Sequence, residues 1–384
     1  MPRLPGTLPG ASGMTTPALF NIAPSLRILL LGVLLAVPPL LWLAYRQRRG
    51  SRTAWMQALT MLTLFLTFDL ILFGAFTRLT DSGLGCPDWP GCYGHASPVG
   101  ANAHIDAAQS ALPDGPVTQG KAWVEMIHRY LATAVGFLIT VLTLSAWRAR
   151  FRAARADTMS PWWPTLTLVW VCIQGAFGAL TVTMKLFPVI VTLHLLAGLF
   201  LLVLLGWQQV RLGQGADGRL PVLMGSALRG LLWVSMTAVW LQVALGAWVS
   251  ANYAVLACSD FPRCQASWWP LMDFEQGFEF WRPLGLTAGG EVLGFAALTA
   301  IHYVHRLVAC VVLLLLGLLA WRLNAVPALR QASRWLAALT ALQLATGLSN
   351  VLLGWPMLAA LAHTGGAAAL LLVMTRTLAS SRTP

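Results

Sequence analysis

The sequence predicts an all-α integral membrane protein with about nine spans: two tandem four-helix transmembrane bundles, formed by an internal duplication, plus an extra N-terminal helix. Three observations predict this class. The 384 residues are 57% hydrophobic and only 10% charged. Apolar runs of about 20 residues recur, which is the length that crosses a bilayer as a helix. Two parts of the chain also repeat the same spaced motifs.

The charged residues predict how the spans are oriented. Most of the 25 Lys and Arg lie in short loops after alternate spans and in the C-terminal tail. Because basic loops stay on the cytoplasmic side, we expect the N-terminus outside and the C-terminus inside. The net charge of +12 then reflects basic loops beside anionic lipid and no nucleic-acid partner. The expected spans are 28–45, 55–76, 124–147, 165–184, 188–207, 231–251, 298–321, 335–353 and 357–375.

The internal duplication shows in fixed spacings. Each copy has a glycine 12 residues before a Cys-x-Asp-aromatic-Pro-x-Cys segment, which covers 86–92 in one copy and 258–264 in the other. Each copy also has a glutamine 20 residues before a histidine, at 174 and 194 and again at 343 and 363. An even number of spans per copy relates the copies by an axis along the membrane normal. We therefore expect an N-terminal segment 1–53 with the extra helix and two bundles, 54–215 and 216–384.

Four cysteines form two pairs in loops that are expected outside, Cys86 with Cys92 and Cys258 with Cys264. An oxidising compartment favours disulfides, and the intervening Pro and Asp favour a tight turn that brings the sulfurs together. Each pair can be a structural staple or an exposed, redox-active disulfide. Zinc is a weaker third interpretation, because no histidine has finger-like spacing to these cysteines.

Four histidines lie inside apolar spans at matching depths, His128 and His194 in one copy and His305 and His363 in the other. Each lies a few residues below the outer end of its span, so about 6–10 Å below the interface. Two imidazoles at one level in a bundle suit a haem iron held between two helices. The alternative for each histidine is an interhelical hydrogen bond.

Charged residues accompany these histidines. Glu125 lies one helical turn from His128 on the same face, and a carboxylate is costly at this depth, which indicates function. His302 occupies the matching place in the second copy, and its role stays open. Arg129 and Arg306 directly follow the histidines and can bind haem propionates, or instead snorkel or form an internal ion pair.

Other polar residues receive simpler interpretations. Asp69 within the second span is expected to cap a helix or to make a helix–helix hydrogen bond. His95, His104 and Lys185 are expected to be solvated. Cys172 and Cys310 lie in apolar spans, where free cysteine behaves as a small buried hydrophobe.

Several stretches carry a resemblance to a known family. They are Thr-Arg-Leu-Thr-Asp-Ser-Gly-Leu-Gly-Cys-Pro-Asp-Trp-Pro at 77–90, Glu-Met-Ile-His-Arg at 125–129 and Gln-Gly-Ala-Phe-Gly-Ala-Leu-Thr-Val at 174–182. The second half adds the paired cysteines, His-Arg at 305–306 and His-Thr-Gly-Gly at 363–366. Over about residues 55–376 the chain resembles the haem A synthase family, integral-membrane enzymes that convert haem O to haem A.

The resemblance implies eight membrane helices in two halves and oxidation of the C8 methyl of haem O to a formyl group. It implies a haem b cofactor between His305 and His363, and a substrate site with His128 and His194 as iron ligands. Glu125 matches the family's essential carboxylate. Paired cysteines in the first outer loop mark a subgroup in which a disulfide has been proposed to take part in activity. The first span departs from the family's eight.

The resemblance also implies a bacterial plasma membrane location. The partners would be the substrate haem O, membrane lipid, a haem O synthase and cytochrome oxidase assembly factors, and a homo-oligomer stays open. Two other classes stay open. A non-catalytic di-haem b electron-transfer protein would need neither Glu125 nor twin cysteine loops. A haem carrier or transporter would open to both sides, whereas all four histidines lie near one face.

Overall fold

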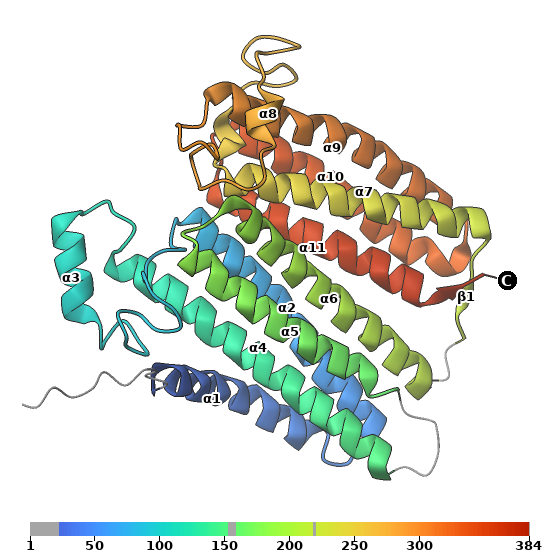
Figure 1. Cartoon of the computed structure of the whole chain (residues 1–384). Helices are drawn as coiled ribbons and strands as arrows, with labels where there is room; N and C mark the ends of the chain where they lie inside the picture. Colours follow the sequence, from blue (N-terminus) through green and yellow to red (C-terminus); the bar gives the residue numbers. More distant parts are fainter. Residues whose placement is uncertain (1–22, 153–158, 218–219, 384) are drawn as a thin grey trace, which may run out of the picture.

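The computed structural model describes residues 23–152, 159–217 and 220–383, and this part of the chain is almost entirely helical (Figure 1). Nine of its helices are long and apolar enough to cross a membrane, which confirms the predicted all-α integral membrane class. Residues 1–22 of the predicted N-terminal segment lie outside the described part. The nine helices are α1 (Ala23–Arg46), α2 (Arg52–Leu79), α4 (Gln119–Arg152), α5 (Trp162–Thr183), α6 (Pro188–Asp217), α7 (Ser226–Ala251), α9 (Phe295–Asn324), α10 (Arg330–Leu352) and α11 (Met357–Ala379).

Several helices extend beyond the predicted spans, because an apolar run marks only the segment inside the hydrocarbon. Helix α4 starts at Gln119 rather than 124, and α6 continues to Asp217 rather than 207. Elements outside the spans are too short to give a span-length apolar run, so the hydropathy pattern does not predict them. They are α3 (Asn102–Ala111), α8 (Phe274–Gly277), η1 (Ala254–Leu256), η2 (Pro327–Leu329), and strands β1 (Val222–Leu223) and β2 (Ser381–Arg382), which pair in parallel.

The long helices form two four-helix bundles that lie side by side. Helices α2, α4, α5 and α6 pack against one another in one bundle, and α7, α9, α10 and α11 in the other. The bundles meet where α6 contacts α7 and α11 and where α2 contacts α11 (Figure 1). Helix α1 packs outside the first bundle against α4, and a Cβ at Gly32 would lie 2.6 Å from the Thr133 side chain. A glycine is therefore needed for this close approach.

The two bundles share one large apolar core in which Leu138, Leu202 and Leu371 are fully buried. Several threonine hydroxyls inside the spans donate to backbone carbonyls of their own helix. The hydroxyls of Thr63 and Thr67, for example, donate to the carbonyls four residues earlier at 2.8 and 2.7 Å. Such back-bonding removes an unpaired donor from a region that offers no water.

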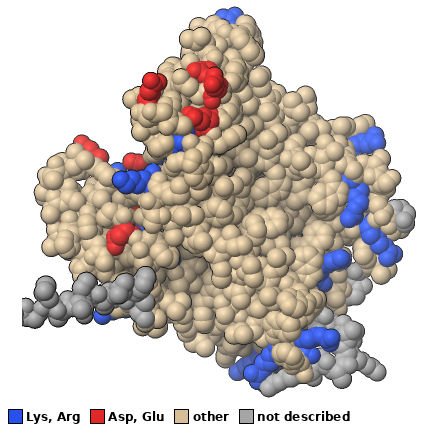
Figure 2. All heavy atoms as spheres, in the orientation of Figure 1, with Lys and Arg blue, Asp and Glu red and all other residues tan. Residues whose placement is uncertain are grey.

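The charges separate toward the two ends of the helices. Figure 2 shows Asp and Glu gathered at the end that carries α3 and α8, and most Lys and Arg at the opposite end, with a nearly uncharged band between them. We call these the loop end and the arginine end. The C-terminal residues lie at the arginine end, where Arg229 Nη1 donates to the carbonyl of Ser381 at 3.0 Å.

This separation predicts that the loop end faces the outside and the arginine end the cytoplasm. Alkaline phosphatase fused after Gly115, in the loop between α3 and α4, should be active because that enzyme needs an oxidising compartment. The same enzyme fused after Arg382 should be inactive. The reverse pattern of activities would contradict the predicted orientation.

Candidate functional site

Both cysteine pairs at the loop end are joined as disulfides. The Cα atoms lie 4.9 Å apart in Cys86–Cys92 and 4.8 Å apart in Cys258–Cys264, within the range that a disulfide spans. No group of three or more His, Cys, Asp and Glu side chains in the described ranges could hold a metal ion directly. The zinc interpretation therefore has no support from this part of the structure.

An aspartate inside each cysteine loop orders the turn. Asp88 accepts the backbone N–H groups of Tyr93 and Gly94 at 2.6 and 2.7 Å. Asp260 accepts those of the matching pair, Gln265 at 2.7 Å and Ala266 at 3.0 Å. The donated hydrogen bonds, first from Ala266, hold the pKa of the exposed Asp260 carboxyl below its ordinary value.

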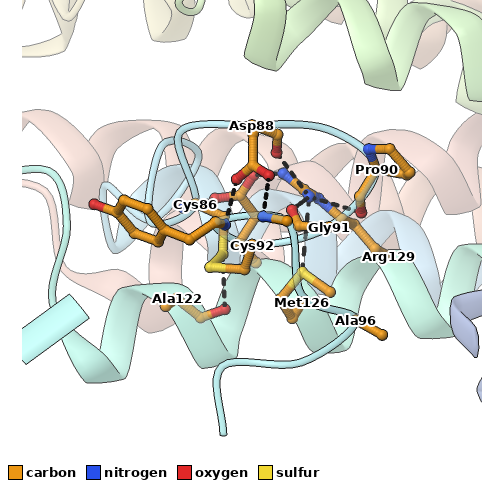
Figure 3. Close-up of a disulfide and its surroundings, with 12 residues drawn as sticks. Cys86, Asp88, Pro90, Gly91, Cys92, Ala96, Ala122, Met126 and Arg129 are labelled. Atoms are coloured by element: carbon orange, nitrogen blue, oxygen red, sulfur yellow. Dashed lines mark hydrogen bonds and ion pairs between the residues drawn. A yellow bond between two sulfur atoms is a disulfide. The ribbon is translucent and has the colours of Figure 1, made fainter. Parts of the chain in front are cut away.

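Arg129 connects the first cysteine loop to α4 (Figure 3). Its Nη1 donates to the carbonyl oxygens of Asp88 at 3.1 Å, Pro90 at 3.0 Å and Gly91 at 2.5 Å. Its Nη2 forms an ion pair with Glu125 Oε1, one turn earlier on the helix. One guanidinium therefore holds three carbonyls of the loop and the carboxylate together.

Glu125 is almost fully buried, with 4% of its surface exposed. Its second oxygen, Oε2, accepts the backbone N–H of Cys86 at 2.8 Å. The loop reaches this position because a Cβ at Gly85 would collide with the backbone of Lys121, so only glycine fits there. The carboxylate thus joins the disulfide loop to α4, the helix that also carries His128, and each of its oxygens has a partner.

The second half repeats this arrangement around Arg306. Its Nη1 donates to the carbonyls of Asp260 at 2.8 Å and Arg263 at 3.0 Å, and its Nη2 to that of Cys258 at 2.7 Å. Its Nε faces His302 Nε2 at 3.3 Å, where the first half has the carboxylate. Both arginines therefore already hold loop carbonyls, and their assignment to haem propionates stays a prediction.

Each of the four intramembrane histidines faces a glycine on the neighbouring helix. A Cβ on these glycines would lie 3.0–3.4 Å from the imidazole, tighter than ordinary contact. The missing side chains leave the room that the imidazole rings occupy inside each bundle. The pairs are Gly74 with His128, Gly178 with His194, Gly246 with His305 and Gly347 with His363.

The histidine-bearing helices are held by matched glutamines. Gln174 Nε2 donates to the carbonyl of His194 at 2.8 Å, and Gln343 Nε2 to that of His363 at 3.0 Å. The Thr346 hydroxyl lies 2.9 Å from His363 Nδ1. In the first bundle the ring of Phe73 stacks on His128, with centroids 6.3 Å apart.

These donor groups fit a haem in each bundle. All four histidine residues are partly exposed. His194 Nδ1 is buried without a hydrogen-bond partner. Two imidazoles from different helices of one bundle are the donor set that would hold a haem iron. The ligand assignments themselves remain predictions.

The structure corrects two of the simpler expectations. Asp69 makes no hydrogen bond or ion pair with any described residue; it lines a groove of about 610 Å³ between α2 and α10–α11. Cys172 and Cys310 are exposed on their spans rather than buried. Spacing along the chain cannot tell which face of an apolar helix meets lipid. His95, His104 and Lys185 are exposed, as predicted.

One charged group near the histidines was missed as a functional candidate. Arg78 lies in the first matching stretch of the family resemblance, yet nothing in its neighbourhood along the chain singled it out. Its side chain is only 15% exposed, and its Nη1 is buried without a hydrogen-bond partner. Its position one turn after Gly74 is the signal that could have identified it.

Fold and site together define a membrane protein of two helical bundles, each with a histidine pair beneath a disulfide loop. A family model described as cytochrome oxidase assembly protein, COX15-CtaA, matches residues 57–375. The chain belongs to this family. Similar relatives are the haem A synthase of Shewanella oneidensis, 37% identical over 82% of this chain and 93% of that protein, and that of Halalkalibacterium halodurans, 25% identical over 77% and 86%.

Replacement of Arg129 by glutamine should destabilise the protein by about 3 kcal/mol, because it leaves the buried Glu125 carboxylate without its cation. Unfolding of the detergent-solubilised protein would measure this. The matched control is Arg376→Gln, which removes an exposed arginine at the arginine end. Equal stability of the two variants would show that the buried ion pair contributes nothing.

Proposed function

We propose that this chain is a haem A synthase, an oxidoreductase that converts haem O to haem A by oxidising the C8 methyl to a formyl group. Family membership and the similarity to curated haem A synthases support the class of activity. The histidine pairs beneath the disulfide loops support haem as the group that both bundles bind.

The two bundles have different roles in this proposal. The C-terminal bundle, 216–384, holds a resident haem b between His305 and His363. The N-terminal bundle, 54–215, receives haem O at His128 and His194. One observation supports this division of roles. The arginine, the glycines and the disulfide loop match in both halves, but the second half has His302 where the first has Glu125.

Glu125 is the catalytic carboxylate of the proposed substrate site. It lies on the His128 face of α4, one turn nearer the loop end, and its ion pair and the Cys86 N–H fix both oxygens. From there it can hold or accept a proton at the reacting edge of the substrate. Haem b, when bound, would supply one-electron and oxygen chemistry. Buried apolar side chains of the cysteine loop and of α4, among them Met126, pack beside Glu125.

The proposed setting is a bacterial plasma membrane with the cysteine loops outside. Haem O is an amphiphile that partitions into lipid, so a site within the outer half of the spans is reachable from the bilayer. A haem O synthase and cytochrome oxidase assembly factors are the proposed partners. Segment 1–53 contributes α1, which acts as an anchor packed against α4.

Glu125→Ala should abolish conversion while the protein keeps its haem b, because the substitution removes the carboxylate from the substrate bundle only. The measurement is chromatography of haems extracted from membranes that co-produce this chain and a haem O synthase, in a host without haem A. Glu291→Ala, at an exposed carboxylate of the loop end, is the control. Loss of haem b together with activity would assign Glu125 a structural role instead.

His305→Ala and His363→Ala should each strip haem b from the purified protein, because each removes one of its two proposed iron ligands. The pyridine haemochrome spectrum of the purified protein gives the haem b content per chain. His128→Ala is the matched variant in the other bundle and should retain haem b. Full haem b content in both C-terminal variants would refute the cofactor assignment.

A further inference from the structure

We propose that Arg78 and Lys121 bind the propionate carboxylates of the haem that enters the N-terminal bundle. The inference rests on the proposed function, because it names the groups that recognise the anionic edge of that substrate. Haem propionates are flexible carboxylates on one side of an otherwise apolar ring. Cations at the rim of a membrane site stabilise such an edge, whereas the hydrocarbon centre does not.

Both side chains lie on helix faces that carry the proposed site. Arg78 follows Gly74 by four residues, so it shares the face that meets His128 and lies one turn nearer the loop end. Lys121 precedes His128 by seven residues, which places it two turns nearer the same end on the histidine face of α4. The two cations therefore lie on the loop-end side of the proposed substrate position.

The cations are incompletely neutralised. Arg78 Nη2 donates to the carbonyl of Ser250 at 2.6 Å, but its buried Nη1 has no hydrogen-bond partner. Lys121 Nζ donates to the carbonyl of Gly115 at 3.1 Å. The two share one carboxylate, that of Asp81, which lies 4.0 Å from Arg78 Nη1 and 3.5 Å from Lys121 Nζ. A buried guanidinium N–H without an acceptor is costly, and a ligand carboxylate would satisfy it.

The other arginines beside the histidines are already engaged. Arg129 and Arg306 donate to three loop carbonyls each and also face Glu125 and His302. If either arginine gave up its carbonyl partners to bind a ligand, it would release its disulfide loop. Arg78 Nη1 has no hydrogen-bond acceptor and only the Asp81 carboxylate nearby, at 4.0 Å, so a ligand would displace no loop carbonyl from it.

The two cations are also specific to the first bundle. Ser250 precedes Cys258 by eight residues, as Arg78 precedes Cys86, and Leu298 precedes His305 by seven, as Lys121 precedes His128. The second bundle thus has a hydroxyl and an apolar side chain at the matching places. This difference separates a site for an arriving anionic substrate from a site for a resident cofactor.

A structural role for Arg78 makes a different prediction. Its guanidinium carbon lies 3.7 Å from the ring centroid of Tyr253, whose hydroxyl bonds Asp81. The cluster therefore also joins the two bundles. If the cluster only held the two bundles together, loss of Asp81 and loss of Arg78 would both lower the stability of the protein. If it binds propionates, Asp81 competes with the ligand, and the two losses act in opposite directions on haem affinity.

The experiment is a spectroscopic titration of the purified, haem b-loaded protein with haem O, read from the Soret difference spectrum. Arg78→Gln should weaken haem O binding about 10- to 100-fold, the effect of one lost charge-assisted hydrogen bond or two. Lys121→Gln should weaken it less, and Asp81→Asn should preserve or tighten it. Lys185→Gln removes an exposed loop-end cation outside the cluster and should leave the affinity unchanged.

Haem O dimethyl ester provides the matched ligand. It should bind wild type at least as weakly as haem O binds Arg78→Gln, because the ester removes the contacts to both cations, and the substitution should weaken ester binding no further. If Arg78→Gln fails to fold, Lys121→Gln and the ester titration of wild type still decide the question. Equal affinities for haem O and its ester, or parallel losses in Arg78→Gln and Asp81→Asn, would overturn the proposal.

Failure of the proposed function gives a different result. In that case wild type itself would show no saturable haem O binding and no haem A in the extraction experiment. Failure of this inference alone would leave wild-type binding and conversion intact, with the Arg78 and Lys121 variants indistinguishable from wild type in both ligands. The resident haem b spectrum shows in each case that the protein is folded.

Discussion

The buried ion pair between Glu125 and Arg129 connects the parts of the first bundle that chemistry would need. A charge at this depth has little water to solvate it, so carboxylate and guanidinium must satisfy each other and their remaining hydrogen-bond positions. The guanidinium does so with three carbonyls of the cysteine loop, and the carboxylate with the Cys86 N–H. A change in the position of the cysteine loop would therefore also change the surroundings of the carboxylate.

The same scaffold appears in the second bundle with one exchange. Arg306 holds the second cysteine loop as Arg129 holds the first, and the glycine–histidine contacts match pair by pair. These correspondences support the predicted internal duplication, which stays a prediction. An imidazole in place of a carboxylate removes the acid that proton handling would need, yet keeps a partner for the arginine. A cofactor site and a reaction site can therefore share one architecture.

Arginine serves distinct purposes along this chain. At the arginine end most arginines lie on the surface, where they carry the predicted orientation in the membrane. At the cysteine loops it organises backbone carbonyls through its fork of donors. At the boundary between the bundles Arg78 keeps a buried donor unused. A haem propionate would satisfy this unused donor, which only the hydrogen-bond partners of the arginines reveal.

The sequence by itself determined the membrane class, the nine spans and the cysteine and histidine candidates, because apolar length and fixed spacing are local properties of the chain. It could not determine which acceptors each arginine binds, because these lie far away along the chain. Arg129 donates to carbonyls about 40 residues away, and Arg78 to that of Ser250, 172 residues away. It also misjudged Asp69, Cys172 and Cys310, because the face that an apolar helix turns to lipid, groove or core is set by packing against other helices. Tertiary structure decided these points, since partners distant in sequence satisfy the buried charges.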